Sequence, residues 1–153
     1  MEQRFESFTV LIAKISKNMR KIKNHEMLEY GLKSPHISCL YYLYLDERLT
    51  AKELCEKCEE DKATISRSLE YLEKNDYIAC ETTDKKRYKT PLALTEKGRE
   101  IGKKIVDKVS FFLDEGGFGM TEEERAVFYR GLNTISENLE RITKNHYRKE
   151  EHL

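Results

Sequence analysis

The sequence predicts a mainly α-helical protein with one small β-hairpin. Over most of the 153 residues, apolar side chains recur every three or four positions, which is the period of a helix with one buried face. Between residues 78 and 94 the period changes to two, as is typical of a pair of short strands. Capping residues mark where several helices begin. Together these patterns predict four helices, a hairpin and two further helices, in a single folded unit over residues 1–153.

Apolar seams run along the first and last predicted helices. In the first helix, expected at about residues 3–24, the seam residues are Phe5, Phe8, Ile12, Ile15, Met19 and Ile22. In the last helix they are Phe128, Leu132, Ile135, Leu139 and Ile142. Such heptad-like seams favour either a contact between two chains or packing on the chain's own domain, and periodicity alone leaves both open.

The second helix is expected from Ser34 to Leu45. Ser34 is predicted as its N-cap and Pro35 as its first residue. Proline suits this position because a backbone N–H there would have no acceptor within the helix, so its absence costs nothing. Its apolar run from Cys39 to Leu45 is far too short to span a membrane, and the N-terminus does not resemble a secretory signal. A cytoplasmic protein with reduced thiols is therefore expected.

A short helix, a turn and another helix follow. The capping box Thr50-Ala51-Lys52-Glu53 begins the short helix, and Asp61 is expected to cap the next one, which ends near Lys74. The predicted buried stripe of that second helix is Ile65, Leu69 and Leu72. Its outward residues are then Lys62, Ala63, Thr64, Ser66, Arg67 and Glu70. This arrangement is that of a helix-turn-helix, whose second helix enters the major groove of DNA.

The hairpin supplies a candidate wing beside that motif. Ile78, Cys80 and Thr82 alternate with other residues on one side of a polar turn, and on the other side the alternating residues are Tyr88, Thr90, Leu92 and Leu94. Pro91 cannot donate to a strand ladder, so its strand is expected at an edge or bulged there. The turn carries three basic residues suited to a narrow minor groove: Lys85, Lys86 and Arg87. The sequence thus predicts a winged helix-turn-helix at about residues 34–99.

The C-terminal third is expected to hold two helices, over about residues 96–146. Thr95 can cap the first of these, and the glycine cluster from Gly116 to Gly119 ends it. Thr121-Glu122-Glu123-Glu124 is a second capping box, which opens the final helix. These helices and the first helix are predicted to flank the winged segment and to form a dimer interface.

Charge and motif content narrow the function further. The net charge is zero, which argues against a protein that coats nucleic acid indiscriminately, but basic residues outnumber acidic ones between 85 and 104. Gly-rich phosphate loops, nucleophile elbows and HExxH patterns are all lacking from the sequence. We therefore expect no catalytic residues, no bound metal and no cofactor.

The sequence resembles the multiple antibiotic resistance regulator (MarR) family. The resemblance is carried by three motifs in order: residues 49–54 (LTAKEL), residues 61–74 (DKATISRSLEYLEK) and residues 94–98 (LTEKG). It covers nearly the whole chain and implies a homodimer with a winged helix in each subunit. It also implies that a ligand or an oxidant governs DNA affinity. The spacing of Asp84, Lys85, Lys86 and Arg87 departs from the family's wing pattern, as does Pro91.

Two groups of residues are candidates for sensing. Cys55 and Cys58 form a CxxC pair one helical turn apart, which suits either redox chemistry or ordinary burial in a core. The resemblance places the reactive cysteine of oxidant-sensing relatives in the first helix, where this chain has none. A pocket for a small aromatic effector would be lined by the residues Tyr30, His36, Tyr41 and Tyr42.

The leading hypothesis is a sequence-specific DNA-binding regulator of transcription, a repressor relieved by a small ligand or another signal. Its dimer would place two recognition helices in successive major grooves, about 10 base pairs apart, on a pseudo-palindromic duplex. Two alternatives remain: a winged-helix protein-interaction module without DNA binding, motivated by the neutral charge and the acidic residues 59–61, and a thiol-based redox regulator using Cys55 and Cys58.

Overall fold

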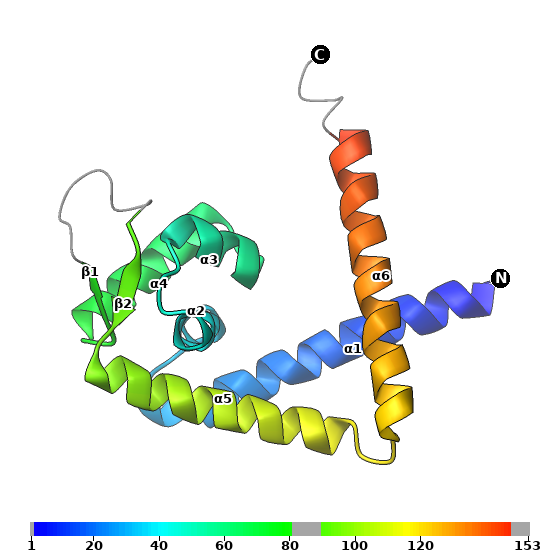
Figure 1. Ribbon diagram of the computed structural model, residues 1–153, viewed down its shortest axis with the longest axis horizontal. Coiled ribbons are helices and arrows are strands. Elements are labelled where there is room, and N and C mark those ends of the chain that lie inside the picture. Colours follow the sequence, from blue (N-terminus) through cyan, green and yellow to red (C-terminus); the bar gives the residue numbers. More distant parts are fainter. Residues whose placement is uncertain (1, 81–89, 148–153) are drawn as a thin grey trace. The chain divides into compact units, whose positions relative to one another are not determined.

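The computed structural model describes the backbone of residues 2–80 and 90–147, and the burial of side chains 7–79 and 90–145. The chain divides into two compact units, residues 1–109 and residues 110–153 (Figure 1). The described elements are six α-helices, one short 3-10 helix and two strands. Among the described helices, none combines the length and the apolar composition that crossing a membrane requires.

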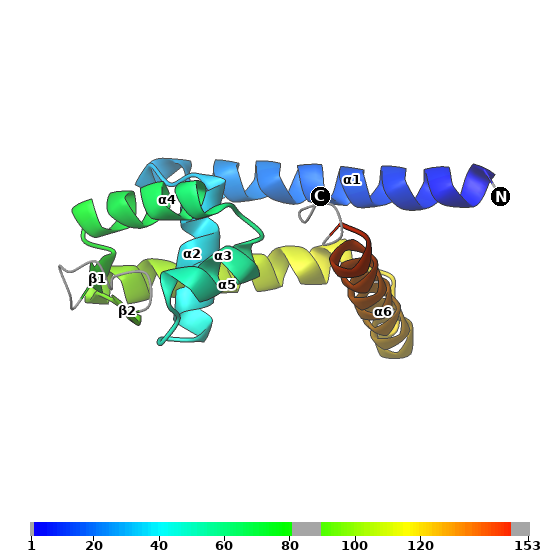
Figure 2. The same ribbon diagram turned by 90° about the horizontal axis from the view of Figure 1, so that it is seen from above.

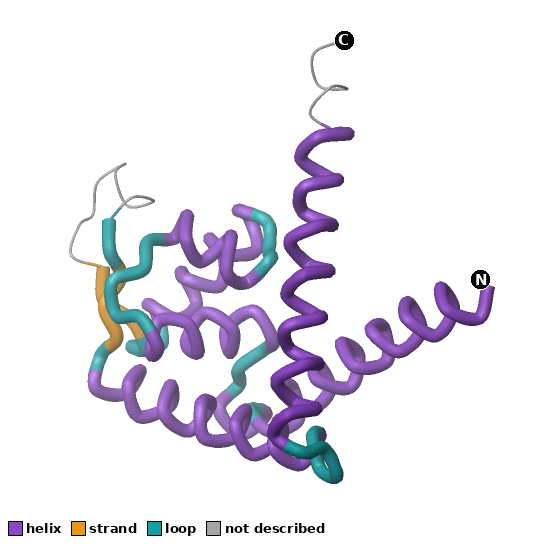
Figure 3. The backbone as a smooth tube through the Cα atoms, turned by 45° about the vertical axis from the view of Figure 1, so that its right-hand side comes forward, coloured by secondary structure: helices purple, strands orange, loops and turns teal. Residues whose placement is uncertain are grey.

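The elements of the first unit follow the predicted order, with one 3-10 turn added between the first two helices. They are α1 (Glu2–Glu26), η1 (Leu28–Tyr30), α2 (Ser34–Leu45), α3 (Ala51–Cys58), α4 (Lys62–Lys74), β1 (Ile78–Cys80) and β2 (Leu92–Leu94). The helix α5 (Glu96–Gly116) begins in this unit. Figure 3 shows the two strands lying together beside the start of α5.

Helix α2 is the centre of the first unit. It packs against α3, α4 and β2, and Figure 1 shows it end-on, with α3 and α4 on one side and α5 on the other. Leu40 and Leu43 of α2 are fully buried, as are Leu54 of α3 and Leu72 of α4. Burying a leucine contributes about 1.5–3 kcal/mol, so these side chains account for much of the stability of this unit. Figure 2 shows the N-terminal part of α1 extending away from this core.

The start of α2 differs from the prediction by one residue. Lys33, not Ser34, is the N-cap, and Pro35 is therefore the second helical residue. The reason is a side chain further along: the Nδ1 atom of His36 accepts a hydrogen bond from the Lys33 backbone N–H at 3.1 Å. The His36 ring, at the third helical position, thus takes the role that a glutamate or glutamine has in a capping box, with Lys33 as the N-cap.

The hairpin is antiparallel, with Ile78 opposite Leu94 and Cys80 opposite Leu92. Pro91 lies just before β2 rather than within it, so no ladder bond is lost there. Leu92 donates its backbone N–H to the Leu49 carbonyl at 3.0 Å, which ties the hairpin to the loop before α3. The predicted turn at residues 83–87, with Thr82, lies outside the described residues.

The second unit consists of the end of α5 and the helix α6 (Glu122–Tyr147). The predicted capping box is confirmed: Thr121 Oγ1 accepts from the Glu124 N–H at 3.2 Å, and Glu124 Oε2 accepts from the Thr121 N–H at 2.8 Å. No side chain between residues 110 and 145 is buried. The seam residues Phe128, Ile135 and Leu139 are 43%, 39% and 51% exposed.

Candidate nucleic-acid interface

The turn between α3 and α4 is fixed at both ends by hydrogen bonds. Thr50 and Glu53 form the predicted capping box, with Glu53 Oε2 accepting from the Thr50 backbone N–H at 2.8 Å. Helix α3 ends where Glu59 adopts a left-handed backbone with φ of 53°. Asp61 then caps α4 by accepting from the Thr64 backbone N–H at 2.7 Å. The three residues of this turn therefore set where α4 begins.

The predicted division of α4 into two faces is confirmed. Ile65, Leu69 and Leu72 are buried, and Ser68 joins them by donating its hydroxyl to the Thr64 carbonyl at 2.8 Å. The residues exposed along the other face are Lys62, Ala63, Ser66, Arg67, Glu70 and Lys74, with Thr64 half-buried beside them. A helix packed in this way presents only small, hydroxyl-bearing and charged side chains outward.

A short chain of side-chain hydrogen bonds organises the exposed start of α4. The Thr64 hydroxyl donates to Asp61 Oδ2 at 3.0 Å and accepts from Arg67 Nη2 at 3.2 Å. The Thr64 N–H and hydroxyl hold the pKa of Asp61 below its usual range, and Arg67 adds a smaller electrostatic contribution. The guanidinium of Arg67 is thus held on the outer face at the end of the helix where partial positive charge accumulates.

The residues 94–98 join the hairpin to the end of α4. The Thr95 hydroxyl donates to the Asp76 carbonyl at 2.6 Å and accepts from the Gly98 N–H at 3.0 Å. Lys97 Nζ donates to the Asn75 carbonyl at 2.7 Å and lies 4.2 Å from the centre of the Tyr77 ring. At Gly98 a Cβ atom would lie 1.9 Å from the Tyr77 carbonyl oxygen, so only glycine fits. These contacts give Thr95, Lys97 and Gly98 of this motif their structural roles.

The predicted wing contacts Lys85, Lys86 and Arg87 lie outside the described residues. What is described is the base of the hairpin, which is tied to α4 through the contacts of Thr95 and Lys97. The wing therefore starts from a fixed position beside the recognition helix.

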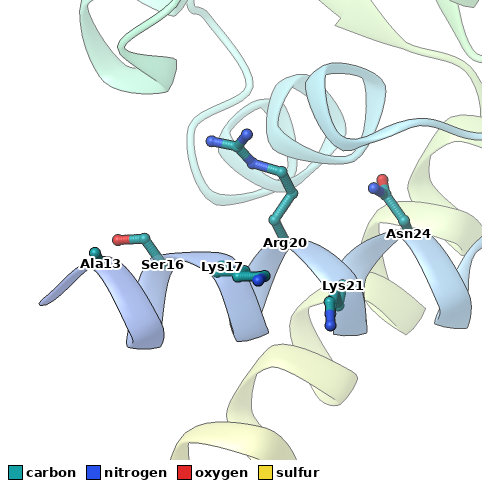
Figure 4. Close-up of a pocket in the computed structure, with 6 residues that line it drawn as sticks. All are labelled: Ala13, Ser16, Lys17, Arg20, Lys21 and Asn24. Atoms are coloured by element: carbon teal, nitrogen blue, oxygen red, sulfur yellow. The ribbon is translucent and has the colours of Figure 1, made fainter. Parts of the chain in front are cut away.

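Helix α1 has two contrasting faces. Phe8, Ile12, Ile15 and Met19 of its apolar seam are between 37% and 48% exposed. The opposite face carries a shallow depression of about 340 Å³, whose lining includes Lys17, Arg20 and Lys21. Figure 4 shows Ser16, Arg20 and Asn24 projecting from one side of the helix. The helix is therefore amphipathic, with an apolar face that no described residue of the chain covers fully.

Two of the four predicted effector residues contact each other, and the other two have different partners. The His36 ring stacks on Tyr71 of α4, with centroids 4.3 Å apart, and burial lowers its pKa. Tyr41 and Tyr42 pack edge to face at 5.2 Å. Lys104 Nζ lies 5.7 Å from the centre of the Tyr30 ring. A depression of about 500 Å³ lies beside η1 and the start of α2; the residues lining it are Asn24, Leu28, Gly31, Leu32, Lys33, Ser34 and Pro35.

Some organising residues were missed by the sequence reasoning. Tyr71 of α4 donates its hydroxyl to the Gly31 carbonyl at 3.1 Å, which ties the recognition helix to the linker before α2. Cys39 of α2 belongs to the buried core against which Cys55 and Cys58 pack. Neither contact has a local signal, because 40 residues separate Tyr71 from Gly31 and 19 separate Cys39 from Cys58. Among the described residues, no three His, Cys, Asp or Glu side chains are grouped to hold a metal ion.

A helix-turn-helix with a polar recognition face, followed by a hairpin joined to that helix, defines a winged-helix protein. The model of the family described as "Winged helix DNA-binding domain" matches residues 36–113, about half of the chain. The chain therefore belongs to the winged helix DNA-binding family, as a MarR-type transcriptional regulator.

Relatives and solved structures agree with this assignment. The chain is 28% identical over 130 residues to the HTH-type transcriptional regulator SarZ of Staphylococcus epidermidis, covering 84% of this chain and 86% of that protein. A MarR family regulator from Neisseria meningitidis has the same fold, with a TM-score of 0.76 and 21% identity over 93% of this chain and 98% of that one. A structure from Listeria monocytogenes, described as a MarR family transcriptional regulator complexed with 26mer DNA, has a TM-score of 0.77 and 25% identity, covering 84% and 85% of the two chains.

Proposed function

We propose that this regulator binds a specific sequence of double-stranded DNA through the exposed face of α4. The observation that carries the proposal is the ordered start of that helix, where Thr64 holds Arg67 outward. A helix N-terminus directs backbone N–H groups toward phosphates, and arginine pairs with the major-groove edge of guanine. Lys62, Ala63 and Ser66 share this face. Ala63 and Ser66 are small enough for DNA to approach the helix closely, and Lys62 is long enough to reach a phosphate.

The wing completes the proposed contact. Lys85, Lys86 and Arg87 follow the strand base that is tied to α4, and their charge suits a phosphate backbone or a narrow minor groove. The solved relative from Listeria monocytogenes is complexed with DNA, which supports the same use of the fold here.

We further propose that the regulator acts as a homodimer, with residues 1–153 of each chain forming one functional unit. The support is the absence of any buried side chain between residues 110 and 145, together with the exposed apolar seam of α1. Large exposed apolar faces on long helices mark contacts between proteins. A two-fold dimer fits a pseudo-palindromic operator, because each recognition helix then reads one half-site.

Repression that a small aromatic effector relieves is the mode of regulation we propose. Its site would be formed by Tyr30, His36, Tyr41 and Tyr42. The His36 stack on Tyr71 links this region directly to α4. A ligand that displaced the His36 or the Tyr71 ring would therefore change the position of the recognition helix through this one contact.

The experiment compares two arginine variants. Duplexes bound by the wild-type protein are first enriched from a random-sequence pool, and affinities are then measured for Arg67→Ala and Arg141→Ala. Arg141 in α6 is a matched control, because it also donates to a side chain three residues earlier, at 2.9 Å. We expect Arg67→Ala to weaken binding about tenfold or more, and Arg141→Ala to leave it unchanged.

Salt dependence separates the roles of helix and wing. Arg87→Ala is expected to weaken binding to all sequences and to reduce the slope of log affinity against log salt by about one. An unchanged slope would show that Arg87 does not contact the DNA backbone. Failure to enrich any duplex would overturn DNA binding altogether and favour the protein-interaction module.

A further inference from the structure

Tyr71 of the recognition helix is attached to the segment that joins α1 to α2. This segment (residues 27–33, the linker) contains η1. The Tyr71 hydroxyl donates to the Gly31 carbonyl at 3.1 Å, and the Tyr71 ring stacks on His36 with an interplanar angle of 1°. His36 in turn accepts from the Lys33 backbone N–H at 3.1 Å. One side chain of α4 therefore holds the linker at two points, directly at Gly31 and through His36 at Lys33.

The linker is also hydrogen-bonded to the end of α1. The Gly31 N–H donates to the Leu28 carbonyl at 3.0 Å, and the Leu32 N–H donates to the Met27 carbonyl at 3.3 Å. Met27 directly follows α1 and is 2% exposed. Gly31 has a left-handed backbone with φ of 67°, and a Cβ atom there would lie 3.2 Å from the Tyr71 hydroxyl oxygen. An ordered turn thus separates α1 from the contact with α4.

An ion pair fixes the same end of α1 to a second element. Lys108 of α5 donates to Glu26 Oε2 at 2.6 Å, across 82 residues of sequence. The two side chains are 39% and 32% exposed, so water shields their attraction only in part. The hydrogen bond from Lys108 lowers the pKa of Glu26, so the carboxylate is charged at neutral pH. The end of α1 is therefore held to α5 by this pair and to α4 through the linker.

Helix α1 has little core of its own to fix its direction. Of its described side chains, residues 7–26, none is buried, and the half-buried ones all lie at its C-terminal end: Ile22, Lys23 and Glu26. Apolar packing is also non-directional, whereas a hydrogen bond depends on the angle at which its atoms meet. Directional contacts at the C-terminal end therefore decide how α1 is oriented.

The length of α1 makes this orientation important. Its 25 residues span about 37 Å, and Figure 2 shows the helix extending away from the core. A rotation of about 5° at one end of such a helix moves the other end by about 3 Å. That displacement is close to the rise of about 3.4 Å from one base pair of DNA to the next. A small change in the angle between α1 and α4 thus matches a shift of one base pair.

We propose that Tyr71 and the Lys108–Glu26 pair are positioning groups that fix the angle between α1 and α4 and so set the half-site spacing that the dimer recognises. On the basis of the proposed function, the apolar seam of α1 contacts the partner subunit and α4 enters the major groove. The partner then fixes the direction of α1, and the contacts at its end determine how far apart the two recognition helices lie. These groups act through the position of α4, not through a contact with DNA.

The test measures a preference for spacing, which a purely structural role would not change. Duplexes bound by the wild-type protein are enriched from a random-sequence pool, and the selected operator is remade with base pairs inserted or removed between its half-sites. Affinity is also measured on a duplex that carries a single half-site. We expect the wild type to lose affinity about tenfold or more when the spacing changes by one base pair.

Two pairs of variants make the result specific. Tyr71→Phe keeps the ring on His36 and removes only the hydroxyl, and its control Tyr129→Phe removes a hydroxyl that has no hydrogen bond to any described residue. Lys108→Met removes the ion pair between elements, and its control Lys103→Met removes one of the same length, 2.6 Å, within α5. We expect Tyr71→Phe and Lys108→Met each to reduce the spacing preference about threefold or more and to leave single half-site affinity nearly unchanged. Both controls should keep the wild-type profile.

The outcomes separate this role from the proposed function. Variants that bind every duplex more weakly by the same factor would have a structural role only, which would overturn the positioning role. Controls that flatten the spacing profile as strongly as Tyr71→Phe and Lys108→Met would overturn it too. A wild-type protein that enriches no duplex overturns the proposed function instead, and the setting of half-site spacing with it.

Hydrogen exchange tests the linker without DNA. Loss of the Tyr71 hydroxyl should loosen the linker, so the amides of Gly31 and Leu32 should exchange about threefold faster or more in Tyr71→Phe. In Tyr129→Phe they should exchange at the wild-type rate. Unchanged exchange at both amides of Tyr71→Phe would show that Tyr71 does not hold the linker, and it would overturn the positioning role whatever the DNA result.

Discussion

The recognition helix α4 and the last helix α6 carry similar apolar patterns, but the apolar face of α4 is buried and that of α6 is exposed. In α4 the stripe of Ile65, Leu69 and Leu72 is buried against α2 and α3. In α6 the corresponding seam stays exposed, with Leu139 showing 51% of its surface. Periodicity therefore reports that a helix has an apolar face, but not whether that face belongs to its own chain or to a partner.

Replacing one leucine in each helix tests this contrast most strongly. Leu72→Ala should cost about 2–5 kcal/mol, because it opens a cavity at a fully buried position. Leu139→Ala should cost much less in dilute protein and should weaken a dimer instead. Thermal melts at several protein concentrations separate the two, since only the second effect depends on concentration. An equal loss at all concentrations would show that α6 packs on its own chain.

Two glycines provide a second matched pair. Gly98→Ala should destabilise the protein by about 1–3 kcal/mol, because its Cβ would meet the Tyr77 carbonyl oxygen. Gly131→Ala lies in α6 with nothing within 4 Å of the added atom. It should stabilise the helix by about 0.5–1 kcal/mol through reduced backbone entropy of the unfolded chain. Chemical denaturation measures both, and a loss at Gly131 would indicate close packing in a dimer.

The two capping boxes allow a comparison of equal local motifs. Thr50→Ala and Thr121→Ala each remove one hydroxyl acceptor at a helix start, a loss of about 1 kcal/mol. In α3 the loss should lower global stability, because the helix is part of a cooperative core. In α6 it should appear as faster amide hydrogen exchange in the first turn. Equal global losses would contradict the separation into two units.

The smallest expected effect is a dependence on pH at the start of α4. The hydrogen bonds from Thr64 lower the pKa of Asp61 below its ordinary 3.8. A carboxyl with a depressed pKa stabilises the fold above its ordinary pKa, and that contribution is lost as pH falls through the lowered value. Asp61→Asn keeps a capping side chain without a charge, so its melts between pH 2 and 6 should show a shallower acid decline. A variant that follows the wild-type curve would assign the decline to other carboxyls.

Local chemistry made most of the fold predictable. The boxes at Thr50 and Thr121 and the cap at Asp61 depend on residues three apart, so the sequence alone places these helix starts. The predicted start of α2 was wrong by one residue, because the His36 side chain bonds back to the Lys33 backbone N–H and Lys33 becomes the N-cap. The outward residues of α4 followed from the helical spacing of its apolar residues. The wing contacts by Lys85, Lys86 and Arg87 remain predictions.

The sequence by itself determined the order of the elements and the polar face of α4, because both follow from helix caps and periodicity. Only the tertiary structure decided which distant groups meet. It brought Tyr71 to the Gly31 carbonyl and the Gly98 backbone to the Tyr77 carbonyl oxygen. Such contacts depend on how the elements pack on one another, because the apolar spacing along a helix shows which face is buried but not which distant residue that face meets.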